Sequence, residues 1–313
     1  AGPAQFVYEE VAGTQCANGT VTGLGISKIA GATSLAVLVN GGGACWDSFS
    51  CFGANAAVDL SVTYSDAVLQ SEIQPFVNSG LVDRSEASNP IHNASMAFVP
   101  YCTADLQDGT SVRQYQADLL GQDIRTVHHA GRTNMQAFTA RLASDFPAVT
   151  QVFLIGASAG GYGAILNDDL FVAAFLHARV DVLVDGAPFV APQNGLYFTW
   201  QSQWTMALPA CTNCDTDLSQ IVQNLRTAQP DRRFALVTSS NDEVIRLFFG
   251  YGLNDMTPQV NALVAAQYQF DNSKAFELTS TQHVLLTGYH SIAGLKDFFD
   301  GWAANDARWA TYR

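Results

Sequence analysis

The sequence predicts an α/β protein with a doubly wound, mostly parallel sheet and helices on both faces. Hydrophobic residues make up 48% of the 313 residues and charged residues 14%, so the chain can bury a large core. Short apolar runs alternate along it with longer segments of helical spacing, as expected of parallel strands joined by crossover helices. We therefore expect residues 1–313 to form a single domain.

Six short runs rich in Val, Leu and Phe are mostly apolar and end in small or polar residues, as strands buried on both faces of a sheet do. They are residues 35–40, 96–101, 151–156, 180–185, 234–239 and 275–279. Apolar residues at helical spacing predict helices at residues 114–124, 135–146, 218–228 and 259–270. Residues 194–217 break this order. Their aromatic side chains form either a lid over a substrate site or a helix buried in the core, and we expect the lid.

The charge of the chain excludes several classes of function. The formal net charge is −13 and the only lysines are Lys28, Lys274 and Lys296, so the surface repels nucleic acid, whose phosphates bind clustered Lys and Arg. No apolar run approaches the roughly 20 residues of a membrane-spanning helix. We expect a protein with no nucleic-acid partner and no membrane span, and we favour a monomer.

Six cysteines and a start at Ala1 rather than Met predict an extracellular protein whose signal peptide has been removed. The even number of cysteines predicts disulfides, and the sequence alone leaves their pairing open. Cys211 and Cys214 could instead form half a zinc site or a redox pair, but no His or second pair of this kind lies nearby. We expect no metal and no organic cofactor.

Ser158 is the strongest candidate for a catalytic residue. It lies in Gly156-Ala-Ser158-Ala-Gly160, directly after the predicted strand at 151–156 and before residues 162–170, which can form a helix. The turn must be sharp, so the residues two before and two after the serine must be small. It holds the hydroxyl at the N-terminus of a helix, where a developing negative charge is favoured. The alternative is a structural serine in a tight turn.

A serine hydroxyl needs a base, and the base needs a carboxylate that orients it. In folds with this turn, the chain order is serine, then acid, then histidine, with the last two on loops after later strands. Asp242 follows the strand at 234–239, and Glu243 and Asp185 are the other candidates for the acid. His283 follows the strand at 275–279 and is the expected base, with His290 as the alternative.

Backbone N–H groups must stabilise the oxygen that becomes negative in such a reaction. Asn40-Gly-Gly-Gly-Ala-Cys-Trp46 follows the first predicted strand, and its glycines can turn their N–H groups toward a substrate. We expect the donors to be the N–H groups of Gly42, Gly43 and Ala159. A phosphate-binding loop is the rival interpretation, but the Lys and Ser or Thr that should follow are missing.

Further motifs accompany the glycine loop, in the order Val99-Pro-Tyr-Cys102-Thr-Ala-Asp105, His129-Ala-Gly-Arg-Thr-Asn134, Gly156-Ala-Ser-Ala-Gly-Gly161 and Ser239-Ser-Asn-Asp242. Together they resemble the pectin acetylesterase/Notum family of α/β hydrolases. The chain departs from that family at Ala157, where Cys is common, and at Asn40, where an acidic residue is common. The resemblance implies a secreted, cofactor-free esterase of α/β-hydrolase fold that uses Ser158, Asp242 and a late histidine.

The expected function is hydrolysis of a carboxylic ester, polymeric or small, through an acyl-enzyme on Ser158. Trp46, Trp200 and Trp204 are expected to contact the ester, together with His129, which precedes the serine and so is not the expected base. Because pectin is polyanionic and this protein is acidic, an uncharged substrate is an alternative. In that case the protein is a polyester depolymerase whose aromatic side chains contact an apolar polymer chain. A noncatalytic binding protein on the same fold is the alternative of another class.

Overall fold

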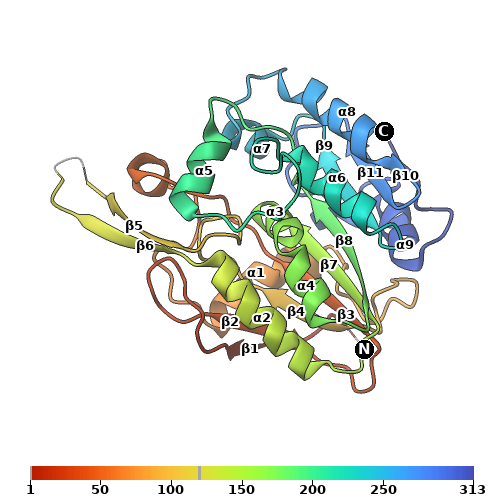
Figure 1. Ribbon diagram of the computed structural model, residues 1–313. Helices are drawn as coiled ribbons and strands as arrows, with labels where there is room; N and C mark the ends of the chain where they lie inside the picture. The colour runs from red at the N-terminus through yellow and green to blue at the C-terminus, as the bar shows by residue number, and fades with distance from the viewer. Residues whose placement is uncertain (1, 119–120) are drawn as a thin grey trace.

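The computed structural model describes residues 2–118 and 121–313, so residue 1 of the expected domain lies outside it. Within these ranges a nine-stranded sheet has the order β1-β2-β4-β3-β7-β8-β9-β11-β10 (Figure 1). Its strands are β1 (Val7–Glu10), β2 (Gly23–Ser27), β3 (Ser34–Val39), β4 (Ser95–Val99), β7 (Gln151–Ala157), β8 (Arg179–Asp185), β9 (Phe234–Ser239), β10 (Gln269–Phe270) and β11 (Ser273–Leu278). A separate pair, β5 (Ser111–Gln116) and β6 (Ile124–His129), forms a hairpin that projects from the body.

The six predicted strands are confirmed, and they form the parallel centre of the sheet. They are β4, β3, β7, β8, β9 and β11, and within this set each strand pairs in parallel with the next. The edge strands β1, β2 and β10 pair antiparallel. Every residue of β4 and β9 is buried, because helices cover both faces of the sheet and leave no polar side.

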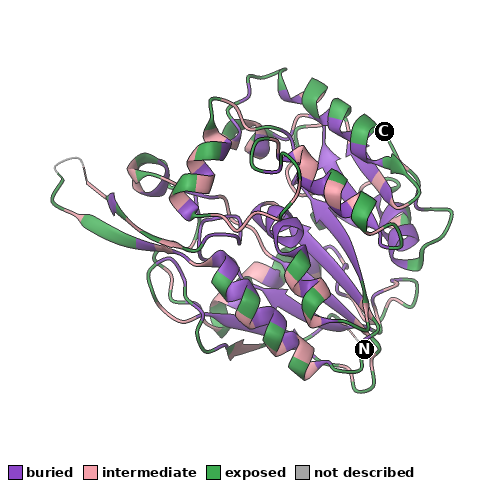
Figure 2. Cartoon of the chain, viewed as in Figure 1, coloured by how far each residue is buried: buried purple, intermediate pink, exposed green. Residues whose placement is uncertain are grey.

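Alternate residues of the central strands enter two apolar cores, one on each face of the sheet. Leu35 and Val37 of β3 belong to the first core, whereas Ala36 and Leu38 belong to the second. The first core is covered by α2 (Gly131–Asp145), α3 (Ala159–Leu166), α4 (Asp168–Ala174), α5 (Leu196–Trp204), α6 (Ser219–Ala228), α7 (Glu243–Phe248) and α8 (Met256–Gln267), and the second by α1 (Asp66–Asn78) and α9 (Leu295–Ala304). Figure 2 shows the buried sheet between helices with exposed outer faces. The doubly wound architecture is therefore confirmed.

Three of the predicted helices are confirmed with shifted bounds, as α2, α6 and α8, and the segment after Ser158 forms α3 and α4. The helix predicted at residues 114–124 is wrong: β5 and β6 occupy its ends, and residues 119–120 within it lie outside the described part of the chain. Partners distant in the chain hold this segment extended. Arg113 of β5 donates hydrogen bonds to the carbonyls of Ser202 and Gln203 near the end of α5, which need such donors.

Residues 194–217 contain α5, whose aromatic side chains lie in the first core. Tyr197, Trp200 and Trp204 are buried, and the two tryptophan rings stack with their centroids 5.4 Å apart. Phe198, on the other side of the helix, is 56% exposed. The aromatic side chains of the expected lid thus pack in the first core, as in the alternative interpretation.

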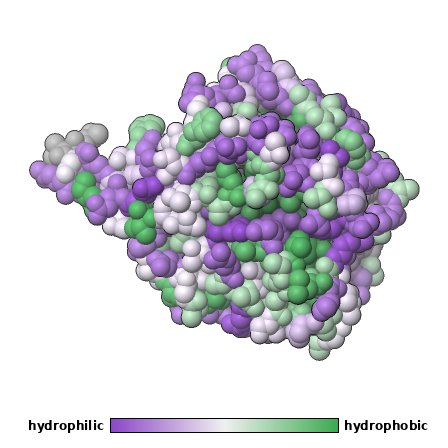
Figure 3. Space-filling model, viewed as in Figure 1, coloured by the Kyte–Doolittle hydropathy of each residue, from purple (hydrophilic) through white to green (hydrophobic). Residues whose placement is uncertain are grey.

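The six cysteines form three disulfides, Cys16–Cys102, Cys45–Cys51 and Cys211–Cys214. Because Cys211 and Cys214 are bonded to each other, they do not form half a zinc site. None of the helices formed by residues 2–118 and 121–313 is long and apolar enough to cross a membrane. Figure 3 shows polar and apolar residues intermixed over one face, with apolar residues gathered near its middle.

Candidate active site

Ser158 lies on the turn between β7 and α3. Its φ of 55° is in the left-handed region, which is strained for a residue with a side chain. The flanking glycines are required, because a Cβ on Gly156 would lie 2.7 Å from the Cα of Gly161, and one on Gly160 would lie 2.6 Å from the carbonyl carbon of Val39. The turn therefore presents the hydroxyl at the carboxyl edge of the sheet.

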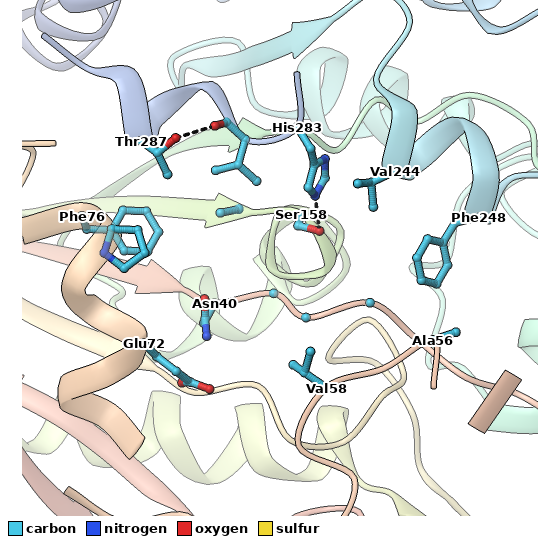
Figure 4. Close-up of a pocket in the computed structure, with 16 residues that line it drawn as sticks. Asn40, Ala56, Val58, Glu72, Phe76, Ser158, Val244, Phe248, His283 and Thr287 are labelled. Carbon is cyan, nitrogen blue, oxygen red and sulfur yellow. Dashed lines mark hydrogen bonds between the residues drawn. The ribbon is translucent and has the colours of Figure 1, made fainter. Parts of the chain in front are cut away.

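His283 lies between Ser158 and Asp242. Its Nε2 is 2.8 Å from the Ser158 Oγ, and its Nδ1 is 2.7 Å from Oδ2 of Asp242 (Figure 4 shows the first contact). Because a carboxylate only accepts hydrogen bonds, Nδ1 carries the proton and Nε2 is free to accept the hydrogen of the serine hydroxyl. The arrangement can make the serine oxygen a nucleophile.

The Asp242 carboxylate is fully buried, and each of its two oxygens has different hydrogen-bond partners. Its Oδ1 accepts hydrogen bonds from the N–H groups of Val244 and Ile245, each at 3.0 Å, and so caps the N-terminus of α7. Its Oδ2 is left for His283. The cap fixes the carboxylate in place, so the histidine ring has a rigid partner.

The other candidates for acid and base lie elsewhere. Glu243 is exposed. Nε2 of His290 is 3.0 Å from Oε2 of Glu86, and 45% of the His290 side chain is exposed. Asp185 is fully buried and accepts hydrogen bonds from the N–H groups of Leu285 and Leu286, while burial raises the pKa of its carboxyl to about 7. Of the residues predicted to act as acid or base, the structure brings Asp242 and His283 to Ser158.

The glycine loop after β3 packs against the turn that carries Ser158. A Cβ on Gly41 would lie 2.8 Å from the Ser158 Cβ and 2.8 Å from the amide nitrogen of Ala159, so the approach requires a glycine. Among the hydrogen bonds of residues 2–118 and 121–313, none uses the N–H groups of Gly41, Gly42 or Gly43. These unpaired donors border the site, as does the first amide of α3, that of Ala159.

Two cavities adjoin Ser158. The larger one, here called the open cavity, has a volume of about 380 Å³ and lies between Phe76 of α1 and Val244 and Phe248 of α7 (Figure 4). The smaller one, here called the inner cavity, has a volume of about 20 Å³ and is lined by apolar side chains that include Trp200 and Phe249. Val244, Phe248 and Ser158 itself border both.

Glu72 of α1 is the one acidic residue on the wall of the open cavity within the described chain. The Tyr64 hydroxyl donates a hydrogen bond to its Oε2. Burial, followed by a hydrogen bond with Asp59, raises the pKa of Glu72 to about 8. In Figure 4 its carboxyl lies beside Asn40, across the cavity from Val244. At neutral pH the cavity therefore presents a mostly uncharged carboxyl among apolar side chains.

The structure corrects most of the predicted substrate contacts. Trp204 and His129 are fully buried, and the indole N–H of Trp204 donates to the Cys45 carbonyl at 2.8 Å. Burial also lowers the pKa of His129 to about 4. Trp46 lines neither cavity, and Trp200 is 1% exposed and reaches only the inner one. These side chains were expected to contact the ester, but Trp200, Trp204 and His129 are buried instead, and the partly buried Trp46 packs against the first core.

Four other residues on the wall of the open cavity were not predicted from the sequence. Val58, Glu72 and Phe76 precede the serine by 80 residues or more, and Phe248 follows Asp242 on a short helix. The cap residue Asp242 is the sequence feature that indicates a helix beginning beside the site. Nothing in the sequence pattern distinguishes Glu72 from other polar residues of an amphipathic helix.

A doubly wound sheet that presents a serine on a strand-to-helix turn, with a histidine and a buried aspartate in line behind it, is the architecture of an α/β hydrolase. A family model described as pectinacetylesterase matches residues 2–196, more than half of the chain. The protein therefore belongs to the pectinacetylesterase family. The matched residues include Ser158 and the glycine loop, whereas Asp242 and His283 lie beyond them.

Individual relatives agree with this assignment. The chain is 25% identical over 158 residues to palmitoleoyl-protein carboxylesterase notum1 of Xenopus laevis, over 50% of this chain and 30% of that protein. The match thus spans less than a third of the curated relative. Two crystal forms of the Wnt deacylase Notum from Drosophila align with TM-scores of 0.65 and 0.59 at 19% and 18% identity. They cover 91% and 88% of this chain and 87% and 83% of theirs, and they show a shared fold.

Proposed function

We propose that this protein is a serine esterase that cleaves carboxylic esters through an acyl-enzyme on Ser158. The observation that carries the proposal is the line of hydrogen bonds from Asp242 through His283 to Ser158, at 2.7 and 2.8 Å. A hydroxyl with a neutral imidazole acceptor and a buried carboxylate behind it is an activated nucleophile.

In the proposed reaction the serine oxygen attacks the ester carbonyl as His283 takes its proton. Asp242 keeps the imidazole in the required tautomer and stabilises the imidazolium. The N–H groups of Gly42, Gly43 and Ala159 stabilise the oxyanion, and losing one such donor costs about 3–4 kcal/mol in the barrier. His283 then protonates the leaving alcohol, and water attacks the acyl-enzyme in the same way.

The two cavities suggest how the ester is oriented. We assign the acyl group to the inner cavity, whose volume of about 20 Å³ suits a methyl-sized group, and the alcohol to the open cavity. An acetyl ester is then the preferred substrate. The apolar wall of the open cavity, with Val58, Phe76 and Phe248, also suits a polyester, which is the second candidate.

We also propose that the protein acts outside the cytoplasm. All six cysteines are paired within the described chain, and disulfides persist in oxidising compartments. Its acidic composition, with a net charge of −13, suits a dissolved extracellular enzyme.

Labelling with a fluorophosphonate probe tests the catalytic proposal. The wild-type protein should label, Ser158→Ala should not, and His283→Ala should label at least about 1,000-fold more slowly because the base is gone. His290→Ala is the control and should label at the wild-type rate, since His290 lies at the surface beside Glu86. A wild-type protein that does not label would favour the noncatalytic binding protein. Labelling of His283→Ala at the wild-type rate would show that His283 is not the base.

A further inference from the structure

Asp185 contacts both the turn that carries Ser158 and the loop that carries His283. It is the last residue of β8, is fully buried, and pairs with Ala157 of β7. Its backbone carbonyl accepts a hydrogen bond from the N–H of Ser158 at 2.8 Å. Its main chain therefore fixes the start of the turn that carries the nucleophile.

The side chain of Asp185 reaches the loop that carries His283. One carboxylate oxygen accepts the N–H of Leu285 at 2.9 Å, and the other accepts the N–H of Leu286 at 2.6 Å. These are the first two amides of the 3-10 helix η2 (Leu285–Gly288), which begins two residues after His283. Both oxygens are used, and both hold the same short helix.

The loop needs this anchor because of Val284, which links His283 to η2. Val284 has a φ of 57°, a conformation that is costly for a β-branched side chain. Such a residue keeps its strained conformation only when surrounding contacts hold it there. The two hydrogen bonds to Asp185 begin at the next residue, and a hydrogen bond from the Thr287 hydroxyl to the Val284 carbonyl closes the turn.

Gly186 completes the arrangement on the other side of the ring. It has a φ of 62°, and a Cβ there would lie 3.1 Å from Cε1 of His283. The backbone directly after Asp185 thus packs against the imidazole, while the Asp185 carboxylate holds the residues that follow it. Gly186 packs against the ring and Asp185 holds the loop that follows it, so both contacts originate at the end of β8.

On this basis, and resting on the proposed esterase function, we propose that Asp185 is a positioning residue that sets the imidazole of His283 against Ser158. It does not touch the substrate and transfers no proton. Its role is to keep Nε2 at hydrogen-bond distance from the serine oxygen by holding the strained loop. This role is distinct from that of Asp242, which contacts the ring itself.

Asp185→Asn tests the proposal, because the amide keeps the shape but places a donor against one of the two N–H groups. With p-nitrophenyl acetate we expect kcat to fall about 10- to 100-fold, the effect of a small misplacement of a catalytic group, while KM stays unchanged. The downfield proton resonance of the His283 Nδ1–H should shift or broaden in the variant, since the ring is no longer held in one position.

Asp181→Asn is the matched control. Asp181 is equally buried on β8, but its carboxylate pairs with Arg233 at the opposite end of the strand. This variant should lower the melting temperature and leave kcat, KM and the histidine resonance unchanged in the folded protein. The proposal would be overturned if Asp185→Asn kept the wild-type kcat. It would also be overturned if the activity of Asp185→Asn fell only in proportion to the fraction of folded protein, as expected for Asp181→Asn. Failure of the esterase function itself is recognised separately, by a wild-type protein that the fluorophosphonate does not label.

Discussion

The length of the acyl chain is the property of the proposed reaction that the structure constrains most. The inner cavity beside Ser158 has a volume of about 20 Å³. That volume holds about one water-sized group, so a longer acyl chain must displace buried side chains. A single methylene changes discrimination by about 1–3 kcal/mol, or about 10- to 200-fold. We expect kcat/KM for p-nitrophenyl butyrate to be at least about 100-fold below that for p-nitrophenyl acetate.

Phe248→Ala is the perturbation that should relax this limit. Phe248 borders both cavities and is only partly buried, so its truncation joins them with a smaller loss of stability than truncation of the fully buried Trp200. The two additional methylenes of the butyryl group then find space and each contributes about 0.8 kcal/mol on burial. The ratio of butyrate to acetate hydrolysis should therefore rise about tenfold or more.

Initial rates of p-nitrophenol release over a range of ester concentrations measure this ratio. Leu247→Ala is the control, because Leu247 lies on the same helix, is 68% exposed and borders neither cavity. Equal kcat/KM values for butyrate and acetate in the wild-type protein would refute the assignment of the inner cavity to the acyl group. So would a ratio that rises as much in Leu247→Ala as in Phe248→Ala.

Three further predictions follow from the pKa shifts and the disulfides. The pKa of Glu72 is raised to about 8, so its carboxyl is neutral below that pH. Above that pH the carboxylate repels the developing oxyanion by about 1–2 kcal/mol. Between pH 7 and 9, wild-type kcat/KM should therefore fall about tenfold relative to that of Glu72→Gln, and parallel pH profiles of the two proteins would contradict this. The pKa of His129 is lowered from 6.5 to about 4, so between these pH values the unfolded chain binds a proton that the folded chain does not. The free energy of unfolding should therefore fall by about 3 kcal/mol as the pH drops through this range. Urea unfolding measures the loss, which should be absent in His129→Gln. Replacing Cys16 and Cys102 by Ala opens a loop with a sequence separation of 86 and should lower the free energy of unfolding by about 4–5 kcal/mol, which calorimetry can check.

Features that depend on neighbours in the chain were predictable from the sequence. The six central strands are mostly apolar because both of their faces are covered, and a run of five or six residues shows this by itself. The turn that carries Ser158 needs its glycines within two residues of the serine, so its motif is local as well. The chain order of acid and base follows from the fold class, and the structure brings Asp242 and His283 to Ser158 accordingly.

The hairpin and the aromatic helix show where local patterns were insufficient. Residues 111–116 became β5 because β6 and the carbonyls of α5 pair with them, and no pattern within the segment reveals those partners. Trp200 and Trp204 were expected on a lid because aromatic side chains suit a substrate site and a core equally well. Their burial depends on which surface α5 packs against, and that is a property of the whole fold.

By itself, the sequence determined the fold class, the turn that carries Ser158 and the residues available as candidates for acid and base. Only the tertiary structure decided which cysteines pair, which walls enclose the cavities, and that Asp242 contacts the His283 ring while Asp185 accepts hydrogen bonds from Leu285 and Leu286. The reason is that Ser158 and His283 are 125 residues apart. Contacts across such separations form only when the packing of all the intervening strands and helices brings the two segments to the same edge of the sheet.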